Sequence, residues 1–398
     1  MRQNHIHPSP VLKNQPTLQS PLSIVAMIVI GVFSTSVLVS TPILSAAMAT
    51  RVGGGQDFIG YLASADFFGM GVASATASFW VLRRFSRRLL LIILGGVFFG
   101  NIISIFVSSF AYLFALRFII GCLNGLILSV VFVGLCRTRS PDRSFGIYVF
   151  VQLALQSVLI PLFSWIWEAY GASSLFTALA LFPLLSIPLL LLFPSSIAQS
   201  HQLTTGSTKT TGVKMIWAGA ALIGLFIYFL APAGIWAYFE PIGQSFGVSG
   251  QEIGNALGLA AFAGMAGAAT VLVIGSTISR AFLMSLGIGL SVIAVILLSG
   301  ASGFLLYLLA ASIFNFAWNF TFPYLMGVIS LFDDSGEVAV LSLVAQLFGL
   351  ALGPFIGALV VSDNEFGPLL SLSILVYCVS FAIFIVCNRV AAARSPSR

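Results

Sequence analysis

Charged side chains are scarce in this sequence. Asp, Glu, Lys and Arg together make up 7% of its 398 residues, whereas a soluble globular domain carries about 25%. Apolar residues make up 59% of the chain, and its mean hydropathy is +1.08. So few charges exclude an ordinary soluble fold, and the composition indicates an integral membrane protein.

Histidine and cysteine are also rare, and neither forms a group that could hold a metal ion. The three histidines, His5, His7 and His201, fall in polar tail or loop segments, and the four cysteines lie in or at the ends of apolar runs without paired spacing. The sequence therefore predicts no metal site, no histidine proton relay inside the membrane and no disulfide framework. We expect no metal and no cofactor.

The basic excess raises the question of a nucleic-acid partner. The net charge is +6 and the pI is near 9.4. The basic residues lie in short turns between apolar runs, however, and form no patch beside stacking aromatic side chains. We expect no nucleic-acid binding, and instead a monomer embedded in the lipid bilayer.

Long apolar runs recur along the whole chain. About 20 apolar residues cross the roughly 30 Å hydrocarbon core as a helix, and a helix satisfies its backbone groups within one segment. Twelve runs are predicted to span the membrane: 22–48, 58–82, 89–109, 113–136, 145–167, 173–193, 214–238, 252–275, 282–299, 303–328, 338–361 and 367–388. The predicted fold class is an all-α integral membrane protein with twelve transmembrane helices.

The positions of lysine and arginine predict the orientation of these helices. Twelve spans place both termini on one side, and fifteen basic residues fall on that side against one, Arg51, on the other. Basic residues favour the cytoplasmic side of a membrane protein. We therefore expect a multi-pass cell-membrane protein with both termini in the cytoplasm; if the source is a Gram-negative bacterium, that membrane is the inner one.

The chain is predicted to consist of two similar halves. The Ser-, Thr- and Gly-rich segment 194–213 indicates a flexible cytoplasmic linker between residues 1–193 and residues 214–398. A shift of 195 residues places "ADFFGMGVA", Ala65–Ala73, on "AAFAGMAGA", Ala260–Ala268. Parallel repeats of this kind occur in secondary transporters, with the substrate near the midplane between the halves.

Six plus six spans, a central linker and a basic turn after the second span together resemble the major facilitator superfamily. The turn "FWVLRRFSRR", Phe79–Arg88, keeps the three bases of the family's gating pattern, Arg84, Arg87 and Arg88, but lacks its two glycines and has Arg83 at the position of its acid. The resemblance implies two pseudo-symmetric six-helix bundles and transport by alternating access. It also implies that spans three, six, nine and twelve are outer helices that face lipid. Asn101 is an exception to this pattern, because it is a polar residue inside span three.

A second family pattern, an arginine followed by small residues at helical spacing, is matched in span four by "RFIIGCLNG", which begins at Arg117. An arginine costs about 2.5 to 3.5 kcal/mol at a helix centre, so its role needs an explanation. Arg117 shares a helix face with Gly121, Asn124 and Gly125, which favours a cavity or another helix over snorkelling to the outer surface.

Asp66 in span two is predicted to lie at a depth that the Arg117 side chain can meet. We expect Arg117 either to pair with Asp66 or to bind an anionic substrate group, with proton uptake by Asp66 switching between the two. A purely structural hydrogen bond at a helix contact is the alternative for Asp66.

Glu240 is the second titratable candidate. It lies in "GIWAYFEPIG", Gly234–Gly243, at the outer end of span seven, where Pro241 is expected to break the helix and expose backbone groups. An interfacial cap with an aromatic belt is the competing interpretation.

Uncharged polar residues within the spans are expected to line a substrate cavity with aromatic neighbours. Hydrogen bonds between helices are the alternative explanation. The expected cavity residues are Asn124, Gln152, Gln156, Trp236, Asn315, Trp318, Asn319 and Gln346.

These features predict a secondary transporter, and no enzyme, that moves a small organic solute by alternating access with coupling to protons; symport and antiport both remain open. An organic anion or a polar metabolite is slightly favoured as substrate. A proton-antiport drug exporter is the first alternative, and a membrane sensor without transport activity is a distant one.

Overall fold

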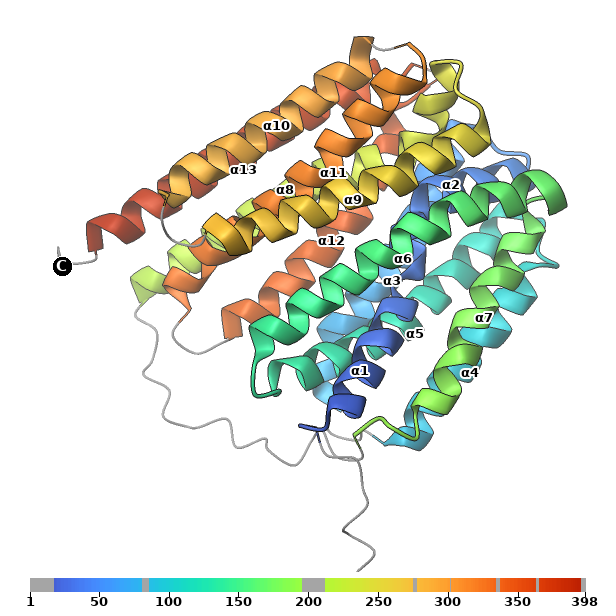
Figure 1. Ribbon diagram of the computed structural model, residues 1–398, viewed down its shortest axis with the longest axis horizontal. Coiled ribbons are helices and arrows are strands. Elements are labelled where there is room, and N and C mark those ends of the chain that lie inside the picture. Colours follow the sequence, from blue (N-terminus) through green and yellow to red (C-terminus); the bar gives the residue numbers. More distant parts are fainter. Residues whose placement is uncertain are drawn as a thin grey trace, which may run out of the picture.

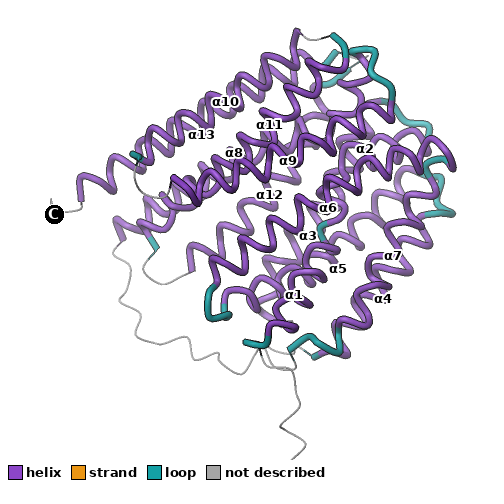
Figure 2. Tube along the Cα trace, viewed as in Figure 1, coloured by secondary structure: helices purple, strands orange, loops and turns teal. Residues whose placement is uncertain are grey.

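A computed structural model describes residues 18–80, 86–194, 212–274, 278–300, 302–333, 337–362 and 365–394, and within these ranges no strand forms (Figure 2). The helices are α1 (Pro21–Ser34), α2 (Ser36–Arg51), α3 (Gln56–Trp80), α4 (Arg87–Ser104), α5 (Phe110–Cys136), α6 (Pro141–Tyr170), α7 (Ser173–Leu189), α8 (Gly212–Ser245), α9 (Gly250–Ile274), α10 (Arg280–Gly300), α11 (Phe304–Ile329), the 3₁₀ turn η3 (Ser330–Phe332), α12 (Glu337–Val360) and α13 (Gly367–Arg394). The chain is therefore an all-α membrane protein, as its composition predicts.

Eleven of the segments in the described part of the chain are long and apolar enough to cross a membrane, and Ser173–Leu189 adds a shorter apolar helix. These twelve correspond one by one to the predicted spans. The ends differ in places: the predicted span 89–109 stops being helical at Ser104, and the predicted span 173–193 ends at Leu189.

The first span is one apolar segment, Pro21–Arg51, that bends between α1 and α2. At the bend, the Ser34 hydroxyl donates to the Gly31 carbonyl (2.7 Å), and the Thr35 hydroxyl donates to the Val32 carbonyl (3.0 Å). Serine and threonine hydroxyls compete in this way with backbone donors and bend helices. The sequence predicts one continuous helix here, and the bend corrects that prediction.

The expected break at Pro241 does not occur. Helix α8 continues through Pro232 and Pro241 and ends at Ser245. A proline removes the N–H that would bond the carbonyl four residues earlier. For Pro241 that carbonyl belongs to Ala237, and the Ser45 hydroxyl of α2 lies 3.4 Å from it. A neighbouring helix thus places a hydroxyl beside this carbonyl, although its proton is donated at 2.6 Å to the Thr41 carbonyl of α2.

The helices form two groups, α1–α7 and α8–α13, which lie side by side (Figure 1). We call the side where α1 begins and α13 ends the terminal side, and the other the distal side. The main helix contacts between the groups are α3 with α12 and α6 with α9. Helix α2, the distal part of the first span, packs on α8, whereas the main contacts of α1 outside its own span are with α5, α6 and α7. The first span therefore meets the second half near the distal side.

Candidate functional site

Arg117 on α5 is enclosed in the first half and bonded on both sides of its guanidinium. Its Nε donates to Asp66 Oδ2 and its Nη2 to Asp66 Oδ1, both at 2.8 Å, while its Nη1 donates to Asn101 Oδ1 at 3.0 Å. The exposed fractions are 0% for Arg117, 1% for Asp66 and 3% for Asn101. Three spans, α3, α4 and α5, are thus joined by one charged group.

Glycines bring α3 and α5 close enough for this pair to form. A Cβ atom on Gly121 would lie 2.2 Å from the Asp66 carbonyl oxygen, and one on Gly125 would lie 2.5 Å from the Met70 carbonyl oxygen. No larger residue fits at this distance, so the backbones touch directly. Gly121 lies one helical turn after Arg117, so the face that allows the approach also carries the arginine.

This geometry decides between the interpretations of Arg117. An arginine that snorkels to the surface would be partly exposed, and Arg117 is not, so that interpretation is wrong. Of the two roles expected for it, the structure contains the pair with Asp66, in the bidentate form that gives the strongest charge-assisted hydrogen bonds.

Asn101, which accepts from Arg117, is a residue of this site that was not predicted from the sequence. A polar side chain deep within a span that is expected to face lipid could have indicated a buried partner for Asn101. Helix α4 does present apolar side chains outward, including Ile92 (71% exposed) and Phe99 (63%), but Asn101 lies on its opposite, buried face.

Two of the expected cavity residues bond to each other across the two halves. Gln156 Nε2 on α6 donates to Asn315 Oδ1 on α11 at 3.1 Å. Asn315 Nδ2 donates to the Ala311 carbonyl, and Asn319 Nδ2 donates to the Asn315 carbonyl. The exposed fractions of Gln156 and Asn315 are 5% and 3%. This pair is therefore a polar contact, shielded from solvent, between the halves.

Aromatic rings of α8 and α11, the helix that also carries Asn315, form a cluster. Trp236 and Trp318 meet edge to face with their centroids 6.4 Å apart, and Phe314 contacts both. Gln152 on α6 and Gln346 on α12 are half-buried. Amides beside aromatic walls are the chemistry of a small-molecule site.

Two contacts between α2 and α8 use carbonyls that prolines leave without a helical donor. Pro42 cannot donate to the Leu38 carbonyl, which instead accepts from Trp236 Nε1 at 2.9 Å. The Ser45 hydroxyl, bonded within its helix to Thr41, also lies 3.4 Å from the Ala237 carbonyl left free by Pro241. We call these two contacts the distal latch, because each joins the two halves on the distal side of the bend.

Glu240 lies on α8 and is 3% exposed. The Gln244 side chain donates to its carboxyl group, and Tyr307 of α11, which donates to the neighbouring Phe239 carbonyl at 2.9 Å, lies close to it. Within the described ranges, no lysine or arginine forms an ion pair with Glu240. It is a buried acid with an amide partner instead of a cation, and not the solvated cap of the competing interpretation.

The family profile of the major facilitator superfamily matches residues 24–358. The chain belongs to the major facilitator superfamily. At the level of sequence, no curated protein matches it.

Solved structures of major facilitator transporters share the fold. The nucleoside transporter NupG superposes with a TM-score of 0.70 and 12% identity over 93% of this chain and 99% of that chain. A D-xylose-proton symporter gives a TM-score of 0.70 and 14% identity over 94% and 97% of the two chains. A structure of a proton-dependent oligopeptide transporter gives 0.68 and 13% over 94% and 97%. At such low identity the likeness shows the fold alone.

The basic turn of this superfamily is described in part. Arg87 at the start of α4 donates to the Phe193 carbonyl at the end of the sixth span, with its Nε at 2.8 Å, and Arg88 is exposed. Arg84 lies outside the described residues. Asn124, expected in the cavity between the halves, instead lines a cavity within the first half.

Proposed function

We propose that this chain is a secondary active transporter that moves a small, uncharged polar organic solute by alternating access. The observation that carries the proposal is the hydrogen bond of 3.1 Å between Gln156 and Asn315, because it joins the facing surfaces of the two halves through groups that a polar solute can replace. The distribution of basic residues supports placing the terminal side in the cytoplasm of a cell membrane. In that orientation the described conformation has its distal latch closed toward the outside.

The substrate class follows from what is available to bind it. Arg117 is fully enclosed, and Asp66 and Asn101 accept from three of its five N–H donors, including both donors of the edge formed by Nε and Nη2. It therefore has no free edge for an organic anion, which favours the polar metabolite among the expected substrates. The amides of Gln156 and Asn315 offer both donors and acceptors, as hydroxyl and amide groups of a solute require.

Coupling to protons is assigned to Glu240 in this proposal. Asp66 is compensated by the guanidinium of Arg117 at 2.8 Å, so burial does not require it to be protonated. Glu240 is buried without a cation, and an isolated ionised carboxylate is costly in such surroundings. The helices packed on α8 bring one titratable side chain close to it within the described residues, Tyr307. A proton on Glu240 in this conformation, released when the distal side opens, would link transport to the pH gradient.

A drug exporter that works by proton antiport is the second candidate. It is favoured by the aromatic cluster of Trp236, Phe314 and Trp318, which could bind a flat apolar compound.

The test is a screen of neutral polar solutes and hydrophobic drugs by thermal shift, followed by uptake of the hits into proteoliposomes under imposed pH gradients. Uptake of a polar solute whose apparent KM rises in Asn315→Ala supports the first proposal. Exchange of drugs without uptake of any polar solute favours the exporter, and binding without any flux overturns transport altogether.

A further inference from the structure

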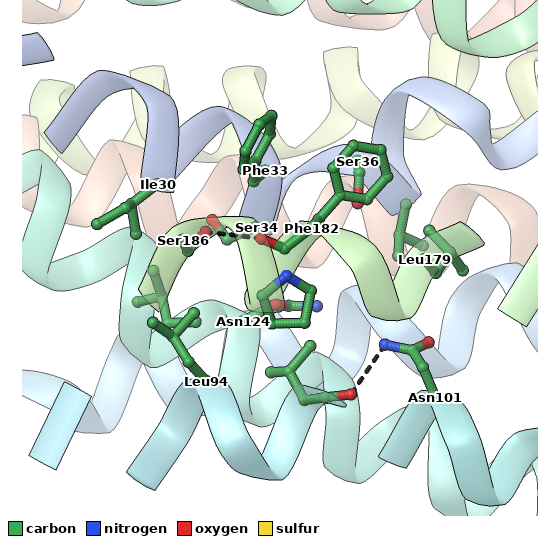
Figure 3. Close-up of a pocket in the computed structure, with 14 residues that line it drawn as sticks. Ile30, Phe33, Ser34, Ser36, Leu94, Asn101, Asn124, Leu179, Phe182 and Ser186 are labelled. Atoms are coloured by element: carbon green, nitrogen blue, oxygen red, sulfur yellow. Dashed lines mark hydrogen bonds between the residues drawn. The ribbon is translucent and has the colours of Figure 1, made fainter. Parts of the chain in front are cut away.

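A small cavity lies inside the first half, away from the facing surfaces of the two halves (Figure 3). Its volume is about 10 Å³, which is room for about one water molecule. Polar side chains from four spans line it, namely Ser34, Ser36, Asn101, Asn124 and Ser186. It therefore differs from the dry, apolar voids that protein interiors tolerate.

Asn124 is one of the polar side chains that this cavity leaves without a protein partner. Its side chain is 4% exposed and forms no hydrogen bond with any described residue. Figure 3 shows it at the centre of the lining group, with no dashed line to a neighbour. The other buried asparagines, Asn101 and Asn315, each donate and accept hydrogen bonds. A buried amide without a partner is unfavourable because it has lost its hydrogen bonds to water, so an occupant is expected.

Two of the spans that line the cavity, the first span and α7, have interrupted backbone hydrogen bonding there. Ser34 and Ser36 flank the bend between α1 and α2, and Pro183 of α7 cannot donate to the carbonyl of Leu179, which also lines the cavity. The Ser34 and Ser186 hydroxyls donate to carbonyls of their own helices and keep lone pairs free to accept. The lining thus offers several acceptors together with the two amide donors of Asn124.

The second half shows why the first half has this space. Phe33 and Phe182 meet with ring centroids 5.1 Å apart, and the residues 195 positions later, Tyr228 and Tyr377, meet at 5.7 Å. Both phenylalanines line the cavity, and both tyrosines are buried. The repeat therefore carries two hydroxyl groups in the second half that the first half lacks.

We infer that this cavity is a binding site for a single water molecule, which hydrogen-bonds to Asn124 and to the hydroxyls at the bend of the first span. Water matches the site because it can accept from the Asn124 amide and donate to Ser34 or Ser186. A monovalent cation matches it less well, because it would use only the amide oxygen of Asn124 and leave the two amide donors without an acceptor, and because the guanidinium of Arg117 is bonded to Asn101 in the lining. The inference concerns the first half alone and does not depend on which solute is transported.

The test is a cryo-EM or crystal map that resolves ordered water, combined with one substitution. In the wild-type protein we expect a peak at about 2.7 to 3.2 Å from a side-chain atom of Asn124. In Phe182→Tyr we expect a hydroxyl to replace that peak and the midpoint of thermal unfolding to rise by about 1 to 2 °C. The matched control is Tyr377→Phe, the reverse change in the second half, which should lower the midpoint.

Two results would overturn the inference. The first is a wild-type map without a peak, together with an Asn124→Leu variant as stable as the wild type, because the cavity would then be dry. The second is thermal stabilisation by NaCl but not by choline chloride that Asn124→Leu abolishes, because the site would then hold a cation. We expect equal unfolding midpoints in the two salts.

Discussion

The indole Nε1 of Trp236 donates to the carbonyl of Leu38 at 2.9 Å, and this carbonyl is available because Pro42, four residues later, has no N–H. The bond joins α8 of the second half to α2 of the first. In a transporter that alternates between two conformations, a contact of this kind stabilises one of them. Its removal should therefore change the balance between the states more than it changes folding.

Trp236→Phe is expected to favour opening of the distal side. The ring remains apolar, but one hydrogen bond worth about 1 kcal/mol is lost from one conformation, which corresponds to a roughly fivefold change in the ratio of the states. Distances between spin labels on the distal ends of α2 and α8 measure this ratio. Trp165→Phe, on a side chain 51% exposed, is the control and should leave the distances unchanged.

Pro42→Ala should act on the same bond from the other side. The new N–H can donate to the Leu38 carbonyl within α2, which weakens its attraction for Trp236. Because both changes affect one interaction, the double variant with Trp236→Phe should shift the ratio by less than the sum of the single effects. Additive effects in the same spin-label measurement would contradict this origin of the latch.

Breaking the buried ion pair should destabilise the first half strongly. Arg117→Leu leaves Asp66 buried without a counter-charge, and loss of one partner of such a pair costs about 3 to 5 kcal/mol. The double variant Arg117→Leu with Asp66→Leu should recover much of this loss, because no unpaired charge remains. Thermal unfolding in detergent measures both, and a double variant no more stable than Arg117→Leu would show that the charges act separately.

Gln156→Ala and Asn315→Ala should each weaken solute uptake. If the solute replaces the bond between these amides, its apparent KM should rise about fivefold, while the unfolding midpoint changes little because one hydrogen bond is worth about 1 kcal/mol. Uptake into proteoliposomes gives the KM. Ser285→Ala, an exposed serine that bonds within α10, is the control and should have wild-type uptake.

Glu240→Gln should separate transport from the pH gradient. The amide cannot take up or release a proton, so an imposed gradient should no longer accelerate uptake, whereas exchange of solute at equal pH should persist. Asp66→Asn is the comparison and should keep the response to the gradient in the fraction of protein that remains folded. A gradient response retained by Glu240→Gln and lost by Asp66→Asn would transfer the role to Asp66.

The sequence by itself determined the membrane fold of this protein. Apolar runs of about 20 residues can be stable in lipid only as helices, because a helix satisfies its own backbone groups. For this reason each of the twelve predicted spans has a helical counterpart. The 195-residue repeat could also be recognised in the sequence. In the structure, the ring contacts Phe33–Phe182 and Tyr228–Tyr377 occur at positions that this shift relates.

The partners of polar groups were decided only by the tertiary structure. The sequence identified Arg117 and Asp66 as neighbours in depth, but the close approach at Gly121 and the third partner, Asn101, depend on how α3, α4 and α5 pack. Pro241 predicts a broken helix when read alone, yet α8 continues there beside α2. Hydrogen bonds between helices depend on rotation and depth to within about an ångström, and residue spacing along one helix does not fix either.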